Sequence, residues 1–464
     1  MQYPLSINKL LNNPKNMSGK ISNILLFIFI FITLTTKPVM LVEFIPGLQL
    51  FILINISVFI FYVFATHKIT VSRIPFVFIL SMMFTLLALI STLYAIDMDR
   101  SIRYLASSFP LRPLLFLSVV IWLKNLERLV LFIKILFFVI TIYAFHGILQ
   151  FLILTFGGFD LTISHQKFGL LGKMWASSSH IGQNGELDIV IPRVQSFCSE
   201  AAFYMCLLNS MLFSGISLLI TADKKINKYY YTIAVGSILL VSLLTLSTAG
   251  IFCMLFGLIL YLLLLRRVKL IKKKVFRASL VFTSIITVLI IYLLQTKVGE
   301  FILNFGFFER FSGTSQSMIS RKEGYSIAFQ SIGDNIFLGA GYGNENLVAQ
   351  QYIGETHGQY SSLLISFIQG GFGTFLLHFG ILMTVFYVFI VIFHRICKLP
   401  AQKRDIFYIL LIGVFVGFLS VNLHGLTIPN TWWYINWYLF ALAYAMKNTI
   451  NTQIQSNTLL NNNK

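Results

Sequence analysis

Residues 251–277 read IFCMLFGLILYLLLL followed by RRVKLIKKKVFR, and this change from apolar to basic shows how the whole chain is organised. The first part of this stretch, residues 251–265, contains no charged residue, whereas residues 266–277 carry seven Lys and Arg residues and no acid. A second apolar run, residues 278–294, follows directly. Because a bilayer keeps basic connectors on its cytoplasmic side, this pattern predicts two transmembrane helices joined in the cytoplasm.

The whole chain repeats this alternation of apolar runs and polar connectors. It has 464 residues, of which 57% are hydrophobic and 11% charged, and its mean hydropathy is +0.81. This composition excludes an ordinary soluble domain and predicts an all-α, polytopic integral membrane protein. The net charge of +19 arises mainly in short connectors, as the positive-inside rule requires, so we expect no nucleic-acid partner. The four cysteines show neither disulfide nor metal spacing, and we expect no metal and no cofactor.

Hydropathy predicts a single transmembrane domain, residues 1–464, that crosses the bilayer with 12 helices. These helices are expected at residues 21–35, 48–65, 74–96, 106–123, 129–156, 197–221, 231–246, 251–265, 278–294, 363–393, 406–421 and 433–446. With the N-terminus inside, the inner connectors hold 23 of the 35 basic residues but only three of the 16 acids. This asymmetry predicts a bacterial inner-membrane protein with both termini in the cytoplasm.

Two connectors on the predicted outer side are long. Residues 157–196 and 295–362 are expected to form periplasmic loops, and long connectors in a compact protein are usually functional or disordered. Their basic residues run against the topology rule, which favours a role in binding an anion. The alternative is that these cations form surface ion pairs with acids of the same loops. The candidate anion-binding residues are Arg193, Arg310, Arg321 and Lys322.

The later loop contains three features that suit a phosphate-bearing substrate. Residues 320–323, SRKE, form a capping box, and the helix start that it predicts offers free N–H groups beside two basic side chains. Residues 337–344, FLGAGYGN, contain three glycines that allow the backbone to approach a ligand closely. His357 follows at the outer boundary, where an imidazole can accept a proton, although a lone histidine is more often structural.

Other polar residues fall within the predicted spans. Glu200 lies seven residues after Arg193, on the same face of a helix, and a carboxylate at that depth needs a partner or a function. Further candidates in the bilayer are Arg112, Lys134, His146 and His378. Lys134 can extend its ammonium group to the cytoplasmic surface, whereas Arg112 is expected to line a groove.

Several of these segments, in this order, resemble the O-antigen polymerase and ligase family. Residues 193–203, RVQSFCSEAAF, are similar to the family's exit from an outer loop, with Ala201 in place of a proline. Residues 244–250, LTLSTAG, resemble its short Ser-rich turn between two helices. Residues 334–344, the pair Thr356-His357 and residues 370–373 are similar to its large late loop and the following helix.

This resemblance implies a metal-independent glycosyltransferase. Its activity would be to polymerise undecaprenyl-pyrophosphate-linked oligosaccharide repeat units at the periplasmic face, in contact with membrane lipid and with a chain-length regulator protein. His357 would act as the general base. The substrate would be bound by Arg193, Glu200, Arg310, Arg321, Lys322, Tyr342, Gln359 and Tyr360.

Two alternatives stay open. An O-antigen ligase would transfer glycan to lipid A–core, but many ligases carry an arginine in the Ser-rich turn where this chain has Thr248, which favours the polymerase. A flippase or transporter for lipid-linked oligosaccharide also suits 12 spans, although the two halves of the chain show no repeat. A flippase is expected to depend on Arg112 and to be indifferent to His357.

Overall fold

The computed structural model describes residues 26, 30, 48–66, 74–108, 111–123, 125–156, 168–169, 172–173, 194, 196, 201–222, 224–245, 247–267, 324–327, 329–331, 336–353, 361–396, 401–428 and 434–462. Apart from short turns and one pair of two-residue strands, β1 Phe168–Gly169 and β2 Gly172–Lys173, these residues are helical. The predicted all-α class is therefore confirmed. The predicted ninth span and the greater part of both long loops lie outside the described residues.

The helices follow the predicted apolar runs closely in most places. Their bounds are α4 Leu48–Thr66, α5 Phe76–Leu93, α6 Met98–Ser108, α7 Leu111–Trp122, α8 Leu126–Phe156, α9 Ala201–Ile220, α10 Lys225–Leu244, α11 Thr248–Arg267, α15 Glu345–Ile353, α16 Ser362–Ile396, α17 Ala401–His424 and α18 Tyr434–Asn462. Of the predicted first span, Leu26 and Ile30 are described, and both are helical and buried.

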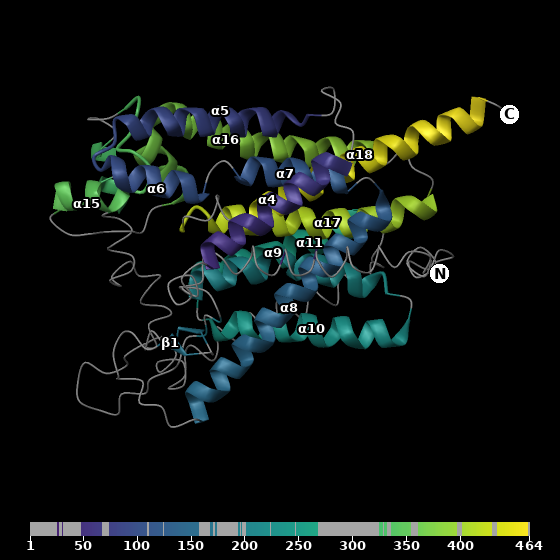
Figure 1. Ribbon diagram of the computed structural model, residues 1–464. Coiled ribbons are helices and arrows are strands. Elements are labelled where there is room, and N and C mark those ends of the chain that lie inside the picture. Colours follow the sequence, from purple (N-terminus) through teal and green to yellow (C-terminus); the bar gives the residue numbers. More distant parts are fainter. Residues whose placement is uncertain are drawn as a thin grey trace.

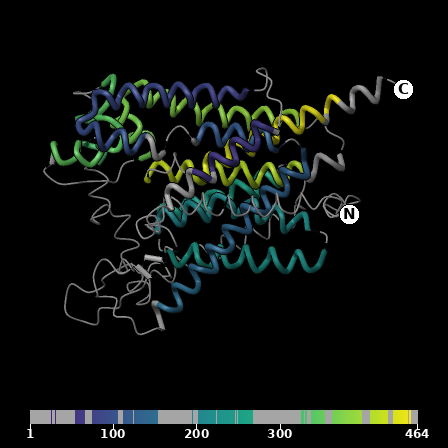
Figure 2. The backbone as a smooth tube through the Cα atoms, viewed as in Figure 1, coloured from purple at the N-terminus to yellow at the C-terminus, as the bar shows by residue number. Residues whose placement is uncertain are grey.

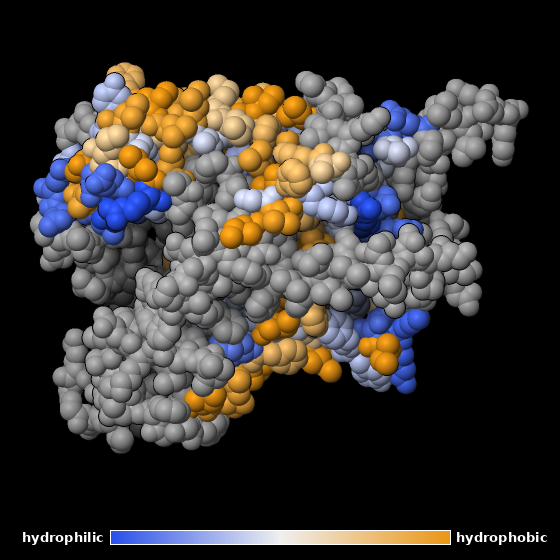
Figure 3. All heavy atoms as spheres, in the orientation of Figure 1, coloured by the Kyte–Doolittle hydropathy of each residue, from blue (hydrophilic) through white to orange (hydrophobic). Residues whose placement is uncertain are grey.

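Within the described part of the chain, six helices are long and apolar enough to cross a membrane. Their spans are Phe76–Leu93, Leu126–Ile153, Ala201–Ile220, Ala249–Arg266, Ser362–Ile396 and Phe407–His424, and two shorter apolar helices are Ile56–Ala65 and Arg112–Trp122. Figure 3 shows apolar side chains over the middle of the described helices and hydrophilic ones toward the two ends. The molecule is thus a helical membrane protein.

The long helices lie side by side as a bundle (Figure 1). α5 and α16 form one side of it, α8 and α10 form the other, and α9, α11 and α17 lie between them. Figure 2 shows the chain running back and forth along the bundle. The end that carries α6, α15 and the start of α16 is called the α15 end below. The connectors after α7 and α9 lie at the opposite end.

Two glycines bring α9 and α17 together backbone to backbone. A Cβ atom on Gly417 would lie 2.3 Å from the Ser210 carbonyl oxygen, and one on Gly413 would lie 2.8 Å from the Phe213 carbonyl oxygen. Beside them the Ser217 hydroxyl donates to the Ile409 carbonyl oxygen at 2.7 Å. In lipid, helices associate through such close packing and interhelical hydrogen bonds, because the bilayer supplies little hydrophobic drive between them.

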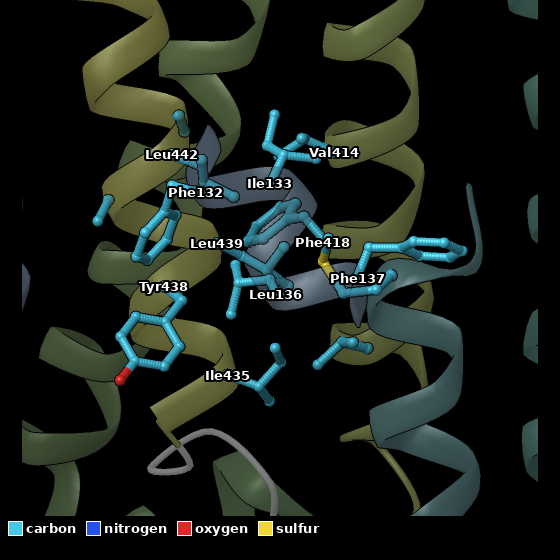
Figure 4. Packing of buried hydrophobic residues seen from close by; sticks show 14 of the residues in the cluster. Phe132, Ile133, Leu136, Phe137, Val414, Phe418, Ile435, Tyr438, Leu439 and Leu442 are labelled. Carbon is cyan, nitrogen blue, oxygen red and sulfur yellow. The ribbon is translucent and has the colours of Figure 1, made fainter. Parts of the chain in front are cut away.

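A second contact region joins α8, α17 and α18 through large apolar side chains. Figure 4 shows Phe132 and Leu136 of α8 facing Leu439 of α18, with Phe418 of α17 close by. The rings of Phe132 and Tyr438 meet edge to face, with 5.6 Å between their centres. This region fixes α18 against α8 and thereby sets the position of the α18 N-terminus.

The structure differs from the sequence in the predicted fourth span, residues 106–123. Residues 106–108 belong to α6, and a separate helix, α7, begins at Leu111. Pro110 accounts for the interruption, because a residue that precedes proline is disfavoured in helical conformation. α7 has 12 residues. At about 1.5 Å per residue it reaches roughly 18 Å, less than the roughly 30 Å of a hydrocarbon core.

Candidate functional site

The glycine-rich run of the later loop docks on a break in α16. Gly371 interrupts that helix with φ 74° and ψ −170°, so the carbonyl groups of the preceding turn lose their helical partners. The loop replaces those partners. The Ala340 amide donates to the Ile368 carbonyl oxygen at 2.7 Å, and the Gly341 amide donates to the Gln369 carbonyl oxygen at 3.0 Å.

Two positions in this contact require glycine. A Cβ atom on Gly371 would lie 2.3 Å from the Phe337 carbonyl oxygen, and one on Gly339 would lie 2.5 Å from the Gly370 amide nitrogen. Both residues also have positive φ, at 74° and 67°. The backbones therefore touch directly, and the Phe372 amide closes the contact by donating to the Ile336 carbonyl oxygen at 2.8 Å. These glycines therefore allow the loop and α16 to pack directly against each other.

The loop is also fixed to α6 and to the turn that precedes it. The Asn344 side-chain amide donates to the Asp97 carbonyl oxygen at 3.2 Å and to the Ala340 carbonyl oxygen at 3.0 Å. The Ser101 hydroxyl donates to the Tyr342 carbonyl oxygen at 2.8 Å. The loop that leads into α15 is thus held on several sides by hydrogen bonds.

A buried cation lies at the start of α7. Arg112 is 2% exposed, and its guanidinium carbon lies 5.6 Å from the centre of the Tyr434 ring at the start of α18. The guanidinium also hydrogen-bonds the Tyr434 hydroxyl, and Tyr104 of α6 lies close enough to interact with its charge. A buried charge in a membrane protein is expensive, and such a residue usually marks a functional site.

Side chains from α15 and α16 extend this group. The Gln369 side-chain amide donates to Glu345 Oε2 at 2.7 Å, and the same glutamine hydrogen-bonds the Tyr104 hydroxyl. The charges of Glu345 and Arg100 also act on Tyr104. We call Arg100, Tyr104, Arg112, Glu345, Gln369 and Tyr434 the Arg112 cluster. It contains two cations and one carboxylate, so its net charge is positive.

Tyr104 is neutral at physiological pH. Burial, with a further contribution from the nearby Glu345 carboxylate, raises the pKa of its hydroxyl to about 12. A neutral phenol can donate a hydrogen bond to an anion, whereas a phenolate would repel one. The cluster can therefore offer guanidinium and hydroxyl donors to a phosphate group.

A second set of polar contacts fixes the entry to α9. Ser196 has φ 50°, a conformation that is uncommon outside glycine. Its amide donates to Gln150 Oε1 at 2.8 Å, and its hydroxyl oxygen lies 2.9 Å from His146 Nδ1. Val194, two residues earlier, is buried and donates its amide hydrogen to the Leu244 carbonyl oxygen at 3.2 Å. The strained conformation at Ser196 is stabilised by several buried contacts.

His378, a candidate from the sequence, helps to stabilise the break in α16. Its Nδ1 atom lies 2.6 Å from the Ser366 hydroxyl oxygen, one turn before the break. The Thr374 hydroxyl bridges the same interruption, because its single hydrogen is shared between the Ser366 and Gly371 carbonyl oxygens, which lie 2.7 and 2.9 Å from its oxygen. These contacts give His378 a structural role in shaping the helix that carries Gln369.

Tyr342 is the predicted site residue that falls within the described part of the chain. It is fully buried, and its ring meets that of Phe84 edge to face, with 6.0 Å between the centres. Burial raises the pKa of its hydroxyl well above the usual value. This packing explains the tyrosine as an anchor of the loop, and its role in substrate binding stays a prediction.

The other predicted site residues lie outside the described residues: Arg193, Glu200, Arg310, Arg321, Lys322, His357, Gln359 and Tyr360. Their described chain neighbours are informative. Val194 and Ala201 flank the entry to α9, and Ile353 and Ser361 flank the segment that contains His357. The Ser362 amide donates to the Gly425 carbonyl oxygen at 2.8 Å, which ties the start of α16 to the turn after α17. The start of α9, the end of α15 and the start of α16 all lie toward the α15 end (Figure 1).

Sequence reasoning singled out Arg112 but missed the other five members of the cluster: Arg100, Tyr104, Glu345, Gln369 and Tyr434. Glu345 directly follows the glycine-rich run, and this position is the sequence feature by which it could have been identified. Within the described residues, no group of three or more His, Cys, Asp or Glu side chains is arranged to hold a metal ion. A scan against protein-family models and a search of curated proteins found no match to this chain.

Proposed function

We propose that this protein is a membrane glycosyltransferase that polymerises oligosaccharide repeat units carried on undecaprenyl pyrophosphate. The observation that carries the proposal is the Arg112 cluster, a net positive group of hydrogen-bond donors built at one end of an apolar bundle. The loop that docks beside Gln369, residues 336–344, leads through α15 toward His357. The resemblance of several segments to O-antigen polymerases and ligases supports the same substrate class.

In this proposal 12 spans cross the inner membrane, both termini are cytoplasmic, and the α15 end faces the periplasm with residues 157–196 and 295–362 as its loops. The position of basic residues supports this orientation. Arg128, Lys224, Lys225 and Lys228 follow the connectors at the end opposite α15, where the positive-inside rule requires basic residues. Labelling of single cysteines placed in residues 295–362 by a membrane-impermeant reagent in intact cells tests it, and protection from the reagent would reject it.

The proposed reaction needs a general base and cations that stabilise the pyrophosphate leaving group. The acceptor hydroxyl loses its proton to His357 while its oxygen forms a bond to the donor sugar carbon, and the bond from that carbon to the pyrophosphate oxygen breaks. Pyrophosphate is a good leaving group if cations stabilise its charge, and Arg193, Arg310, Arg321 and Lys322 are assigned that task. A general base contributes about 10²–10⁴-fold to such a rate.

Reconstitution of the purified protein with lipid-linked repeat units tests the function. Wild-type protein is expected to give a ladder of polymer without lipid A–core, whereas His357→Ala gives none. His394→Ala is the matched control, because His394 is an exposed histidine in the last turn of α16, at the opposite end of the bundle. Product that forms only when lipid A–core is added would identify a ligase instead.

A flippase for the same lipid is the second candidate. The break in α16 at Gly371 and the buried Arg112 favour it, because transporters build substrate sites from interrupted helices. The two functions predict different outcomes for His357→Ala. A flippase moves lipid-linked sugar across a vesicle membrane with His357→Ala as well as with wild type, and makes no polymer.

A further inference from the structure

We infer that the Arg112 cluster binds the phosphate-bearing headgroup of a lipid, with Arg112 as a direct ligand of the phosphate oxygens. The inference rests on the proposed function for its substrate class, but it concerns a different set of residues. The arginines assigned from the sequence belong to the long loops or their exit, whereas this site is built by α6, α7, α15, α16 and α18.

The presence of an arginine at the start of α7 indicates that the cluster binds an anion. Nine of the 12 residues of α7 are apolar, and packing that helix against α18 needs no charge. Arg112 is nevertheless buried there, where an ion costs several kcal/mol to desolvate. An apolar residue of similar size packs such a position at least as well, so stability does not explain the arginine. A guanidinium binds phosphate oxygens in pairs, which does explain it.

The surrounding charges and helix ends add to the positive electrostatic potential at Arg112. Arg112 is the second residue of α7, and Tyr434 is the first residue of α18, so the positive ends of two helix dipoles meet at the guanidinium. Arg100 adds a second cation on the Tyr104 side. Two carboxylates oppose these cations: Glu345, whose Oε2 atom accepts a hydrogen bond from Gln369, and Asp97, whose Oδ1 atom accepts one from the Arg100 amide. Both lie on the Arg100 and Tyr104 side, whereas the two helix N-termini meet at Arg112, so an anion is favoured at Arg112 itself.

The cluster reaches the surface through its outer members. Arg100, Tyr104 and Glu345 are all half-buried, whereas Arg112 and Gln369 lie behind them at 2% and 1% exposure. The outer members belong to α6 and α15, at one end of the apolar bundle (Figure 1), which is the level at which lipid headgroups lie. A lipid held there would bring its headgroup to Arg100 and Tyr104 first and to Arg112 next. This position favours a lipid headgroup over a free phosphate ion.

Binding of undecaprenyl pyrophosphate without sugar to the full-length protein in nanodiscs tests the inference. Arg112→Met should weaken binding about 10–100-fold, the value expected for loss of a charge-assisted, two-pronged contact. Methionine preserves the apolar volume but removes the guanidinium that hydrogen-bonds the buried Tyr434 hydroxyl, so the thermal midpoint is expected to fall modestly. The double variant Arg112→Met/Tyr434→Phe, which also removes that hydroxyl, should regain the midpoint but not the binding, which excludes misfolding as the cause. Arg103→Met is the matched control, since Arg103 is exposed on α6, and should bind as wild type does.

The outcomes separate the inference from the proposed function. Wild-type affinity in a folded Arg112→Met protein would overturn the inference, and so would equal binding of undecaprenol, which lacks phosphate. Inorganic pyrophosphate that competes as strongly as the lipid would show that the site takes free anions, against a lipid headgroup. Arg112-dependent binding in a protein that makes no polymer would leave the inference standing and reject the polymerase.

Discussion

Replacement of Gly371 by alanine is expected to undock the glycine-rich loop from α16. The new Cβ atom would lie 2.3 Å from the Phe337 carbonyl oxygen, and the backbone at φ 74° and ψ −170° is a region that essentially only glycine occupies. Strain of about 1–3 kcal/mol and loss of the hydrogen bond from the Phe372 amide, about 0.5–1.5 kcal/mol, together give a destabilisation of about 1.5–4.5 kcal/mol.

Two measurements report this change. The thermal midpoint of the purified protein should fall, and chymotrypsin should cleave after Tyr342, which is fully buried in the docked loop. Gly380→Ala is the matched control on the same helix, because its Cβ atom would meet only Leu80 Cδ1, at an ordinary 3.8 Å. A Gly371→Ala protein with the midpoint and the protease protection of Gly380→Ala would show that the contact between loop and helix does not hold the site together.

Four further outcomes follow from the same structure. Gly417→Ala should destabilise the bundle by about 1–3 kcal/mol through overpacking against α9, whereas Gly236→Ala, which meets nothing within 4 Å, should not; equal midpoints would contradict the packing. Tyr204→Phe removes a buried 2.6 Å hydrogen bond to the Tyr143 carbonyl oxygen and should cost about 0.5–1.5 kcal/mol in chemical unfolding, a loss that an unchanged midpoint would refute. Because burial raises the pKa of Tyr104 to about 12 from a usual 10, the stability that its neutral form contributes is present below pH 10 and is lost as pH rises toward 12. Wild type should therefore lose thermal stability faster than Tyr104→Phe over that interval, and parallel curves would reject the assignment. Arg193→Lys should abolish polymer formation if the arginine holds pyrophosphate with two donors, and full activity would reduce it to a surface charge.

The alternation of apolar runs and basic connectors determined the class of the protein. Runs such as residues 129–156 and 363–393 can be satisfied only as helices in a bilayer, because lipid offers no partner to an exposed backbone. The corresponding helices, α8 and α16, begin and end within three residues of those predictions. Pro110 also lies in the sequence, but hydropathy averaged over a window hides its interruption of the predicted fourth span.

The site depended on contacts that no local pattern contains. Arg112 stood out as a charge in an apolar run, yet its partners Tyr104 and Tyr434, and Gln369 that hydrogen-bonds Tyr104, come from three other helices and are ordinary residues in their own segments. The sequence showed that residues 337–344 can approach another backbone closely, because glycine permits it. That this backbone is the broken turn of α16 at Gly371 became visible in the packed molecule, because hydrogen bonds between residues far apart in the chain form only once the helices have packed.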